Sequence, residues 1–422
     1  MWISCIINAD SNACLVRVMN TMNLHFSDEL VSFRKTVRDY FESVLPGDVK
    51  KRNYYLSYPP DDDDALLWGR LLHKRGWSVP SWPVEYGGCG WSELQQYIFE
   101  DEWMACGAPV GHWAATHMIG PVIYTFGSDK QKERFLPIIR EHRYTWAQGF
   151  SEPGSGSDLA SLRTSAVRDG EHYLVSGQKI WTSGAHHSKW GFFLVKTDTS
   201  CKPQQGMSLL LIEMDSPGVS VKPIRQIDGR AHVCEVFLDD VKVPVSHRIG
   251  EEGDGWSFAK FLLENERTAS SFVFWNKREF CKLKELATKE MIQGSPISKN
   301  AEFSAKISSI AADLLALEWS VLRVLVSNDA QANSAALVSS LKVLGSQLQQ
   351  RITELQTEVL GKKALRSFQL DDLERIIPPD GEVWPDYAVG KSTIALHCRA
   401  STIYGGSLQV QKTIIAKKAF GL

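Results

Sequence analysis

Two segments near the middle of the chain constrain its fold and chemistry most. The first, QGFSEPGSGSD at residues 148–158, is rich in hydroxyl and glycine residues, so little side-chain bulk covers its backbone N–H groups. Such a loop can approach a polar ring edge or a pyrophosphate closely. The second, QKIWTSG at residues 178–184, has the pattern of a strand that places a Trp and, two residues later, a hydroxyl on the same side. An aromatic plane with donors aimed at a heterocycle is what a bound flavin requires of its protein. Each segment alone also fits a plainer interpretation, a surface loop and a β-hairpin with a core Trp.

Composition narrows the class of protein. Lys plus Arg number 47 against 49 Asp plus Glu, so we expect neither a nucleic-acid footprint nor a polybasic membrane surface. The hydrophobic content of 43% is ordinary for a globular protein, and no apolar run is long enough to span a membrane. The eight cysteines are scattered without a CxxC pair, which argues against structural zinc and a disulfide framework and predicts a reducing cytoplasm. We expect no metal.

Hydrophobic periodicity divides the 422 residues into three parts. Residues 22–143 are expected to form an N-terminal helical domain, beginning with an amphipathic helix capped by Ser27. Residues 144–250 hold short apolar or alternating runs broken by glycine turns, typical of a compact antiparallel β domain. Helical patterns return over residues 251–422 and predict a four-helix bundle, so the fold class is α+β. Residues 1–21 lack the features of a signal peptide and are expected to be an extension before Met22.

Several common motifs are missing, and one charged run has a simple explanation. No GxGxxG opens a βαβ unit, and there is neither a Walker lysine loop nor a GxSxG elbow. A nicotinamide enzyme, a P-loop ATPase and an α/β-hydrolase are therefore disfavoured.

The aspartates 61–64 precede an apolar helical pattern, so we interpret them as a solvated helix N-terminus rather than a metal site.

Taken together and in this order, the two central segments resemble the flavin-binding signature of the acyl-CoA dehydrogenase family. The resemblance runs from about Phe26 to the C-terminus, with one departure at Phe150, where the family usually carries a smaller aliphatic residue. It implies the same three-part architecture and FAD as the cofactor. The implied reaction is α,β-dehydrogenation of an acyl-CoA thioester to the 2-enoyl-CoA, with electrons passed to an electron-transfer flavoprotein.

This reaction needs a base for the proton next to the carbonyl, which works best in a dry pocket that raises its pKa. The family most often places this glutamate in an Ile-Tyr-Glu-Gly-Thr run, but here the run at residues 403–407 has Gly405 in its place. A minority of members keep it in a Leu-x-x-Glu-Arg context on the first long helix after the β domain. The matching run, LLENER at residues 262–267, makes Glu266 the predicted base, on the same helix face as Leu262. The alternative is that Glu266 only pairs with an arginine between helices.

The resemblance also assigns binding roles. Trp181 would cover one flavin face and Ser183 would hydrogen-bond the N5 edge, whereas Thr182 points the other way on the strand. The residues expected at the cofactor are Gln148, Phe150, Ser151, Gly156, Ser157, Trp181, Thr182, Ser183, Ser407 and Gln409, and those expected at the CoA thioester are Ser157, Glu264, Arg267 and Gly406.

One family feature is degenerate. Many members carry an Arg-x-x-Phe-Gly run that reaches the neighbouring subunit's FAD, and residues 275–281 retain only a trace of it. Together with Gly405 and Glu266, this resembles the large subunit of two-component bacterial acyl-CoA dehydrogenases, several of which act on bulky or dicarboxylic acyl-CoAs, including steroid side chains. We therefore expect a homo-oligomer or a heterotetramer with a paralogous subunit. Two alternatives stay open: a flavin monooxygenase or oxidase of the same fold, and a non-catalytic subunit, which Gly405 would suit and Glu266 would not.

Overall fold

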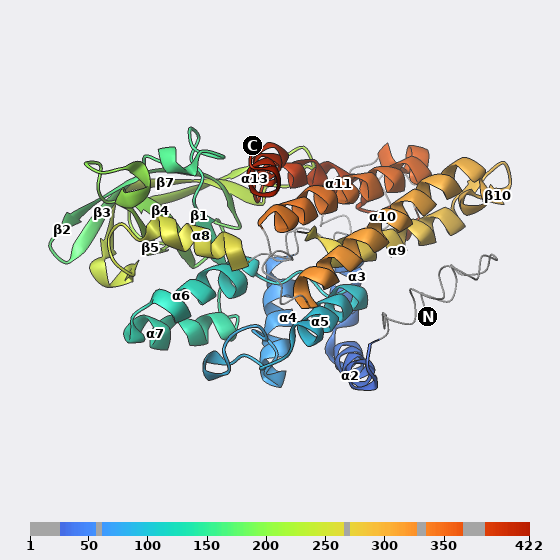
Figure 1. Cartoon of the computed structure of the whole chain (residues 1–422), viewed down its shortest axis with the longest axis horizontal. Helices are drawn as coiled ribbons and strands as arrows, with labels where there is room; N and C mark the ends of the chain where they lie inside the picture. Colours follow the sequence, from blue (N-terminus) through green and yellow to red (C-terminus); the bar gives the residue numbers. More distant parts are fainter. Residues whose placement is uncertain (1–25, 56–60, 266–270, 327–334, 366–384) are drawn as a thin grey trace.

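The computed structural model describes residues 26–55, 61–265, 271–326, 335–365 and 385–422. The chain forms N-terminal helices, a central sheet and C-terminal helices in succession, and the sheet lies at one end of the elongated molecule (Figure 1). This is the α+β order expected from the sequence. The expected extension, residues 1–21, lies outside the described residues.

The N-terminal part is helical as predicted. Its helices are α2 (Asp28–Val44), α3 (Gly47–Tyr55), α4 (Asp62–Arg75), α5 (Glu93–Cys106), the π-helical η3 (Ala114–Ile119), α6 (Gly120–Phe126) and α7 (Asp129–Arg140). The predicted cap is confirmed, because the Ser27 side chain accepts a hydrogen bond from the Leu30 amide. The aspartate run is a helix start as predicted, because Asp61 caps α4 and the acidic first turn suits the positive end of the helix dipole. The expected solvation holds only in part, since Asp64 is buried and accepts two hydrogen bonds from Arg52.

The central sheet has the strand order β6-β7-β3-β2-β4-β5-β8, and β1 pairs with β4. Most neighbours are antiparallel, as expected, but β1 runs parallel to β4, and β2 makes a short parallel contact with β4. Strands β4 and β5 are buried along nearly their whole length, which explains their continuous apolar sequences. The strands are β1 (Trp146–Gly149), β2 (Ser165–Asp169), β3 (His172–Ser183), β4 (Trp190–Lys196), β5 (Met207–Glu213), β6 (Val219–Ile224), β7 (Val233–Pro244) and β8 (Arg248–Ile249).

The C-terminal helices pack around α11, which contacts α9, α10, α12 and α13. They are α8 (Gly255–Asn265), α9 (Val273–Lys289), α10 (Ala301–Val326), α11 (Ala335–Leu360), α12 (Lys391–His397) and α13 (Leu408–Phe420), and a small hairpin of β9 (Met291–Ile292) and β10 (Ser295–Pro296) follows α9.

The helical pattern expected over residues 251–422 is interrupted at two places near predicted site residues. Helix α8 ends at Asn265 and α9 begins at Val273, directly after Phe272, which adopts a positive φ of 53°. The segment between α12 and α13 includes Gly405 and Gly406, which have φ values of 64° and 87° that only glycine adopts easily. Both interruptions lie close to residues predicted to bind substrate: Phe272 follows Arg267 by five positions, and Gly406 is itself one of the predicted contacts to the thioester.

One apolar core joins the N-terminal helices, the sheet and α8. It includes Ile119 before α6, Phe135 on α7, Trp146 on β1 and Leu262 on α8. The strand that leads into the hydroxyl-rich loop and the helix that leads toward Glu266 therefore share one packed support.

Candidate active site

A buried ion pair holds the hydroxyl-rich loop in place. Lys179 on β3 is fully buried, and its Nζ lies 2.8 Å from Glu152 Oε1 while also donating to the Phe150 carbonyl oxygen at 3.2 Å. Glu152 accepts two more hydrogen bonds, from the amides of Arg163 at 2.6 Å and Thr164 at 2.9 Å. Glu152 thus connects the loop to β3 through Lys179 and to the residues just before β2 through the amides of Arg163 and Thr164.

The protonation of this pair follows from its surroundings. Burial lowers the pKa of Lys179 to about 8, against the opposing influence of Glu152. Burial alone would raise the pKa of Glu152, but Lys179 and Thr164 hold it below its usual value. Sequence reasoning missed this pair, although both residues stand inside the two segments that it singled out.

Trp181 lies at the surface and not in the core. Its side chain is 58% exposed, and its backbone has a positive φ of 61° within a register shift between β3 and β7. Non-glycine residues with a left-handed backbone are uncommon and cluster at functional sites. Ser183 is exposed, whereas Thr182 is fully buried opposite Cys234, so the predicted alternation is confirmed. The core-Trp interpretation is wrong.

We expect Trp181→Ala to lower flavin content while leaving the fold intact, because the variant loses an exposed stacking surface and no core packing. The measurement is the FAD-to-protein ratio of the purified protein, with far-UV circular dichroism to check the fold. Trp319→Ala, which removes a partly exposed Trp from α10, is the matched control. Equal FAD content in the Trp181 variant and the wild type would contradict the stacking role.

The predicted loop residues differ in exposure. Gly156 and Ser157 are exposed, and an added Cβ at Gly156 would meet nothing within 4 Å, so the backbone there is open to a ligand. Phe150 is half-buried and packs edge-on against Phe192 with ring centroids 5.8 Å apart, which explains the larger side chain. The Ser151 carbonyl accepts from the Ile180 amide at 2.9 Å, so this run offers a ligand its backbone donors rather than its carbonyls. Gln148 lies on β1 beside Phe192.

Gly405 lies beside a buried lysine. Lys342 on α11 donates to the Ser401 carbonyl oxygen at 2.9 Å, and its ammonium stands over the rings of Phe272 and Tyr404. An added Cβ at Gly405 would lie 3.6 Å from Lys342 Nζ. A carboxylate held beside an ammonium has a lowered pKa, which weakens it as a base. The nearby Lys342 therefore gives a physical reason why position 405 does not carry the catalytic base.

The other predicted residues of this region fall into three groups. Ser407 caps α13, with its side chain accepting from the Val410 amide, and Gln409 is exposed on the first turn of that helix. Gly406 is half-buried. Glu264 lies in α8, whereas Glu266 and Arg267 lie outside the described residues, so Glu266 stays a prediction.

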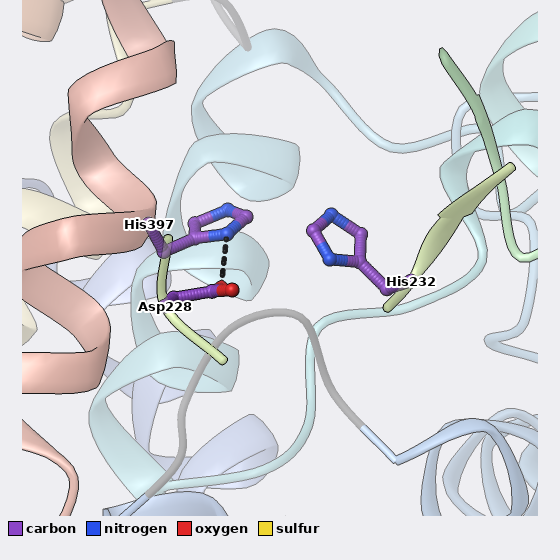
Figure 2. Close-up of side chains that lie close together, drawn as sticks. All are labelled: Asp228, His232 and His397. Atoms are coloured by element: carbon purple, nitrogen blue, oxygen red, sulfur yellow. Dashed lines mark hydrogen bonds and ion pairs between the residues drawn. The ribbon is translucent and has the colours of Figure 1, made fainter. Parts of the chain in front are cut away.

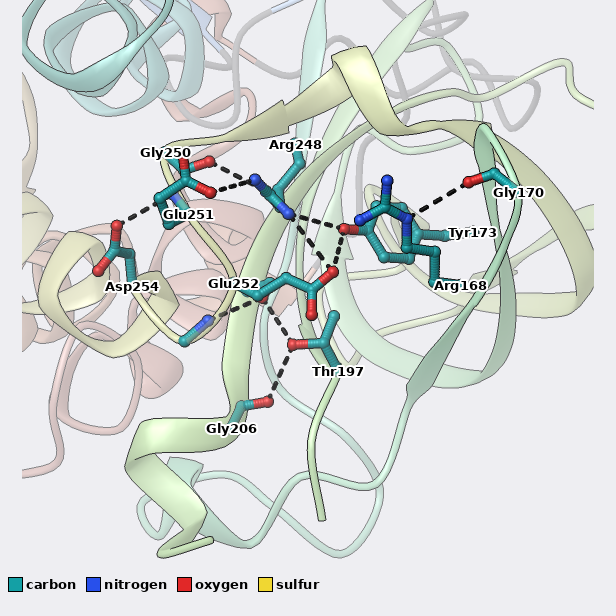
Figure 3. A network of polar contacts seen from close by, with 12 residues as sticks. Arg168, Gly170, Tyr173, Thr197, Gly206, Arg248, Gly250, Glu251, Glu252 and Asp254 are labelled. Carbon is teal, nitrogen blue, oxygen red and sulfur yellow. Dashed lines mark hydrogen bonds and ion pairs between the residues drawn. The ribbon is translucent and has the colours of Figure 1, made fainter. Parts of the chain in front are cut away.

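A polar network fixes the start of α8, the helix that leads to Glu266 (Figure 3). Arg248 donates to the Tyr173 hydroxyl at 3.0 Å, and that hydroxyl donates to Glu252 at 2.6 Å. The Gly253 amide donates to Ser208 on β5, which attaches the turn before α8 to the sheet. The network holds the approach to the predicted base against the domain that carries the flavin segments.

The degenerate run at residues 275–281 lies in the first half of α9 and is largely buried. Lys277 stands three residues before Phe280, where the family carries the arginine. Its Nζ lies 2.6 Å from Asp101 and 2.7 Å from Glu318, so this cation is paired within its own chain.

Asp228, His232 and His397 connect the sheet with the C-terminal helices (Figure 2). Asp228 is buried in the loop after β6, and its Oδ2 lies 3.2 Å from Nδ1 of His397 at the end of α12. Burial lowers the pKa of His232 to about 3, so this imidazole is neutral near pH 7. Potential ligand atoms of the three residues lie within 4.8 Å of one another, and in the described part of the chain no other such group of three occurs. Because the Asp228–His397 contact joins the loop after β6 to the end of α12, we interpret the group as a link between domains.

Comparison with known proteins identifies the class. The chain matches three family models in order: acyl-CoA dehydrogenase N-terminal domain (residues 27–142), middle domain (147–241) and C-terminal domain (253–420). The family models and the relatives named acyl-CoA dehydrogenase support an oxidoreductase that acts on acyl-CoA. The chain belongs to the acyl-CoA dehydrogenase family.

Individual relatives span nearly the whole chain. Acyl-CoA dehydrogenase IpdE1 of Mycobacterium tuberculosis is 33% identical, with 93% of this chain and 98% of the relative covered. Its namesake in Mycolicibacterium smegmatis is 31% identical over the same shares. Among solved structures, the ChsE4-ChsE5 complex from Mycobacterium tuberculosis matches with a TM-score of 0.79 at 29% identity, covering 95% of this chain and 99% of the other. The Tcur3481-Tcur3483 steroid acyl-CoA dehydrogenase matches with a TM-score of 0.81 at 25% identity, covering 95% and 99%. No helix in the described residues is long and apolar enough to cross a membrane.

Proposed function

We propose that this chain is an FAD-dependent dehydrogenase that converts an acyl-CoA thioester to its 2-enoyl-CoA and passes the electrons to an electron-transfer flavoprotein. The observation that carries the proposal is the exposed Trp181 platform, with Ser183 on the same side and the pinned hydroxyl-rich loop beside it. These residues fit a flavin, since they offer a stacking plane, a hydroxyl and open backbone at Gly156. FAD supplies the acceptor for the β hydride.

The remaining roles belong to residues of this chain. Glu266 takes the α proton, and it follows Leu262, a buried residue of α8, by four positions in the sequence. A carboxylate becomes a stronger base where apolar groups remove it from water. The CoA thioester is held by Ser157, Glu264, Arg267 and Gly406. The proposal is tested by mixing the flavin-loaded protein anaerobically with acyl-CoAs and following the loss of flavin absorbance. A flavin that stays oxidised with every acyl-CoA would contradict it.

We also propose that the working enzyme contains a second, paralogous subunit. The two solved structures reported above are each named for two different proteins, and Lys277, which stands at the arginine position of the degenerate run, pairs with Asp101 and Glu318 of its own chain. A subunit that lacks the arginine contact to the neighbouring FAD needs a partner subunit that provides this arginine. The scattered cysteines support a place in a reducing cytoplasm.

The chain expressed alone is expected to purify largely without flavin. A charge-assisted hydrogen bond to phosphate contributes about 1.5–3 kcal/mol, so its loss weakens cofactor retention roughly ten- to hundredfold. The measurement is the FAD-to-protein ratio and the mass of the chain alone and co-expressed with a paralogue. One tightly held FAD per chain in an active homotetramer would show that no second subunit is needed.

A further inference from the structure

The three side chains that face one another between the sheet and the C-terminal helices have the donor set of a metal site (Figure 2). Asp228 and His397 are buried, and His232 is half-buried. Two imidazoles and one carboxylate are ligands that divalent first-row transition metals such as Zn²⁺ accept in proteins. The three residues therefore offer an ion a complete set of protein ligands with one position left open.

A hydrogen-bonded link explains only two of the three residues. Asp228 Oδ2 lies 3.2 Å from Nδ1 of His397, and Asp228 Oδ1 accepts from the Arg230 amide at 3.0 Å. His232 takes no part in these bonds. Its Nδ1 is buried, and among the described residues it has no hydrogen-bond partner. A buried polar atom without a partner costs free energy, so the position of this nitrogen beside a carboxylate and a second imidazole indicates a ligand.

The distances suit a single ion. Two donors that are each about 2.1 Å from a tetrahedrally coordinated ion are about 3.4 Å apart. The observed separation of Asp228 Oδ2 and His397 Nδ1, 3.2 Å, is close to this value. The three ligand atoms lie within 4.8 Å of one another. A ligand at this limit would have to move closer by about 1.4 Å, which a rotation of the half-buried His232 side chain can supply because no described residue bonds its Nδ1.

The surrounding charges favour a cation. The Arg230 guanidinium interacts electrostatically with three carboxylates, those of Asp228, Asp61 and Asp62. His187 lies 2.9 Å from Asp62 and balances its charge only when protonated. The carboxylates in this group outnumber the permanent positive charge, so a divalent cation would be attracted to it.

We propose that Asp228, His232 and His397 bind a divalent transition-metal ion whose fourth position is open to water. The inference does not depend on the proposed flavin chemistry. The sequence did not indicate the site, since Asp228 and His397 are 169 positions apart.

The ion would strengthen the junction between the sheet and the C-terminal helices. The His232 carbonyl accepts from the Gly184 amide at 2.7 Å, and Gly184 directly follows Ser183, a predicted flavin contact. His397 ends α12, which packs on α11. Metal binding would therefore couple the strand that carries the flavin residues to the helices that follow it.

The test titrates Zn²⁺ into the full chain after treatment with a chelator, using isothermal titration calorimetry. The wild type is expected to bind one ion per chain. His232→Gln and Asp228→Asn should each weaken binding by more than about tenfold, because even the loss of an outer partner of a metal ligand costs about ten- to hundredfold in affinity. His172→Gln, at an exposed position at the start of β3, is the matched control and should bind like the wild type. Mg²⁺ should not compete, since it prefers oxygen ligands.

Co²⁺ in place of Zn²⁺ reports the type of ligand. Nitrogen and oxygen ligands should give visible d–d bands without a sulfur-to-cobalt charge-transfer band. The buried Cys234 follows His232 by two positions, so a charge-transfer band would assign the ion to a cysteine and overturn the proposed ligand set.

The melting temperature provides an independent measurement. Zn²⁺ binds the folded junction, so it should raise the melting temperature of the wild type and of His172→Gln but not that of His232→Gln. No binding to the folded wild type, or equal affinity in the wild type and both ligand variants, would overturn the proposal. If Asp228→Asn does not fold, His232→Gln and the cobalt spectrum of the wild type still decide it.

Discussion

Glu266→Gln is expected to take up flavin normally and to lose about two to four orders of magnitude in the rate of flavin reduction by acyl-CoA. The amide has nearly the shape of the carboxylate but cannot accept the α proton. The measurement is anaerobic stopped-flow mixing of the flavin-loaded variant with the substrate that reduces the wild type fastest. FAD content and the dissociation constant for a non-reacting acyl-CoA should stay near the wild-type values.

The control is Glu358→Gln, which changes an exposed glutamate of α11 that pairs with Lys306 and should reduce flavin at the wild-type rate. Rapid flavin bleaching in Glu266→Gln would show that Glu266 is not the base. Because Gly405 has no side chain, the base would then have to be a residue other than these two.

Lys179→Met is expected to lower the free energy of unfolding by about 3–5 kcal/mol, because the variant leaves the Glu152 carboxylate buried without its cation. Both residues are at most 8% exposed, so water cannot replace the lost partner. The hydroxyl-rich loop should loosen as well, since Lys179 donates to the Phe150 carbonyl. Urea unfolding followed by circular dichroism measures the change. Lys242→Met, an exposed position on β7, should stay within about 0.5 kcal/mol of the wild type.

The deficit of Lys179→Met should also depend on pH in a defined direction. In the wild type the pKa of Glu152 is below its usual value, so its contribution to stability is present at neutral pH and is lost as the pH falls. In the variant the buried, unpaired carboxyl has a raised pKa and is relieved by protonation. The difference between the two proteins should therefore shrink in acid, and a constant difference would contradict the ion-pair explanation.

Much of the fold could be predicted from local sequence patterns. The Ser27 cap, the aspartates before α4 and the alternation of Trp181, Thr182 and Ser183 depend on neighbouring residues, and all were predicted from the sequence. The helix interruptions before α9 and at Gly405 were not predicted. The apolar residues keep their helical spacing in the segments before and after a short interruption, so the periodicity does not reveal it.

Long-range pairs could not be predicted in the same way. The Lys179–Glu152 bond joins two segments whose approach depends on the pairing of β1 with β4 and of β3 with β2 and β7. Asp228 meets His397 from a distant part of the sequence. The partners of Lys277, at the arginine position of the degenerate run, are also set by packing, because Asp101 on α5 and Glu318 on α10 are distant in sequence.

The internal contacts of the hydroxyl-rich loop have a consequence for the order of folding and cofactor binding. Its geometry is held by the protein's own carboxylate, lysine and amides, so the flavin segments can reach their final shape on an empty polypeptide. If the proposed flavin and paralogous subunit are correct, folding of this chain and loading of its cofactor can be separate events in biosynthesis. A newly made chain would then reach its binding conformation before the second subunit joins it, so cofactor supply need not match the rate of translation.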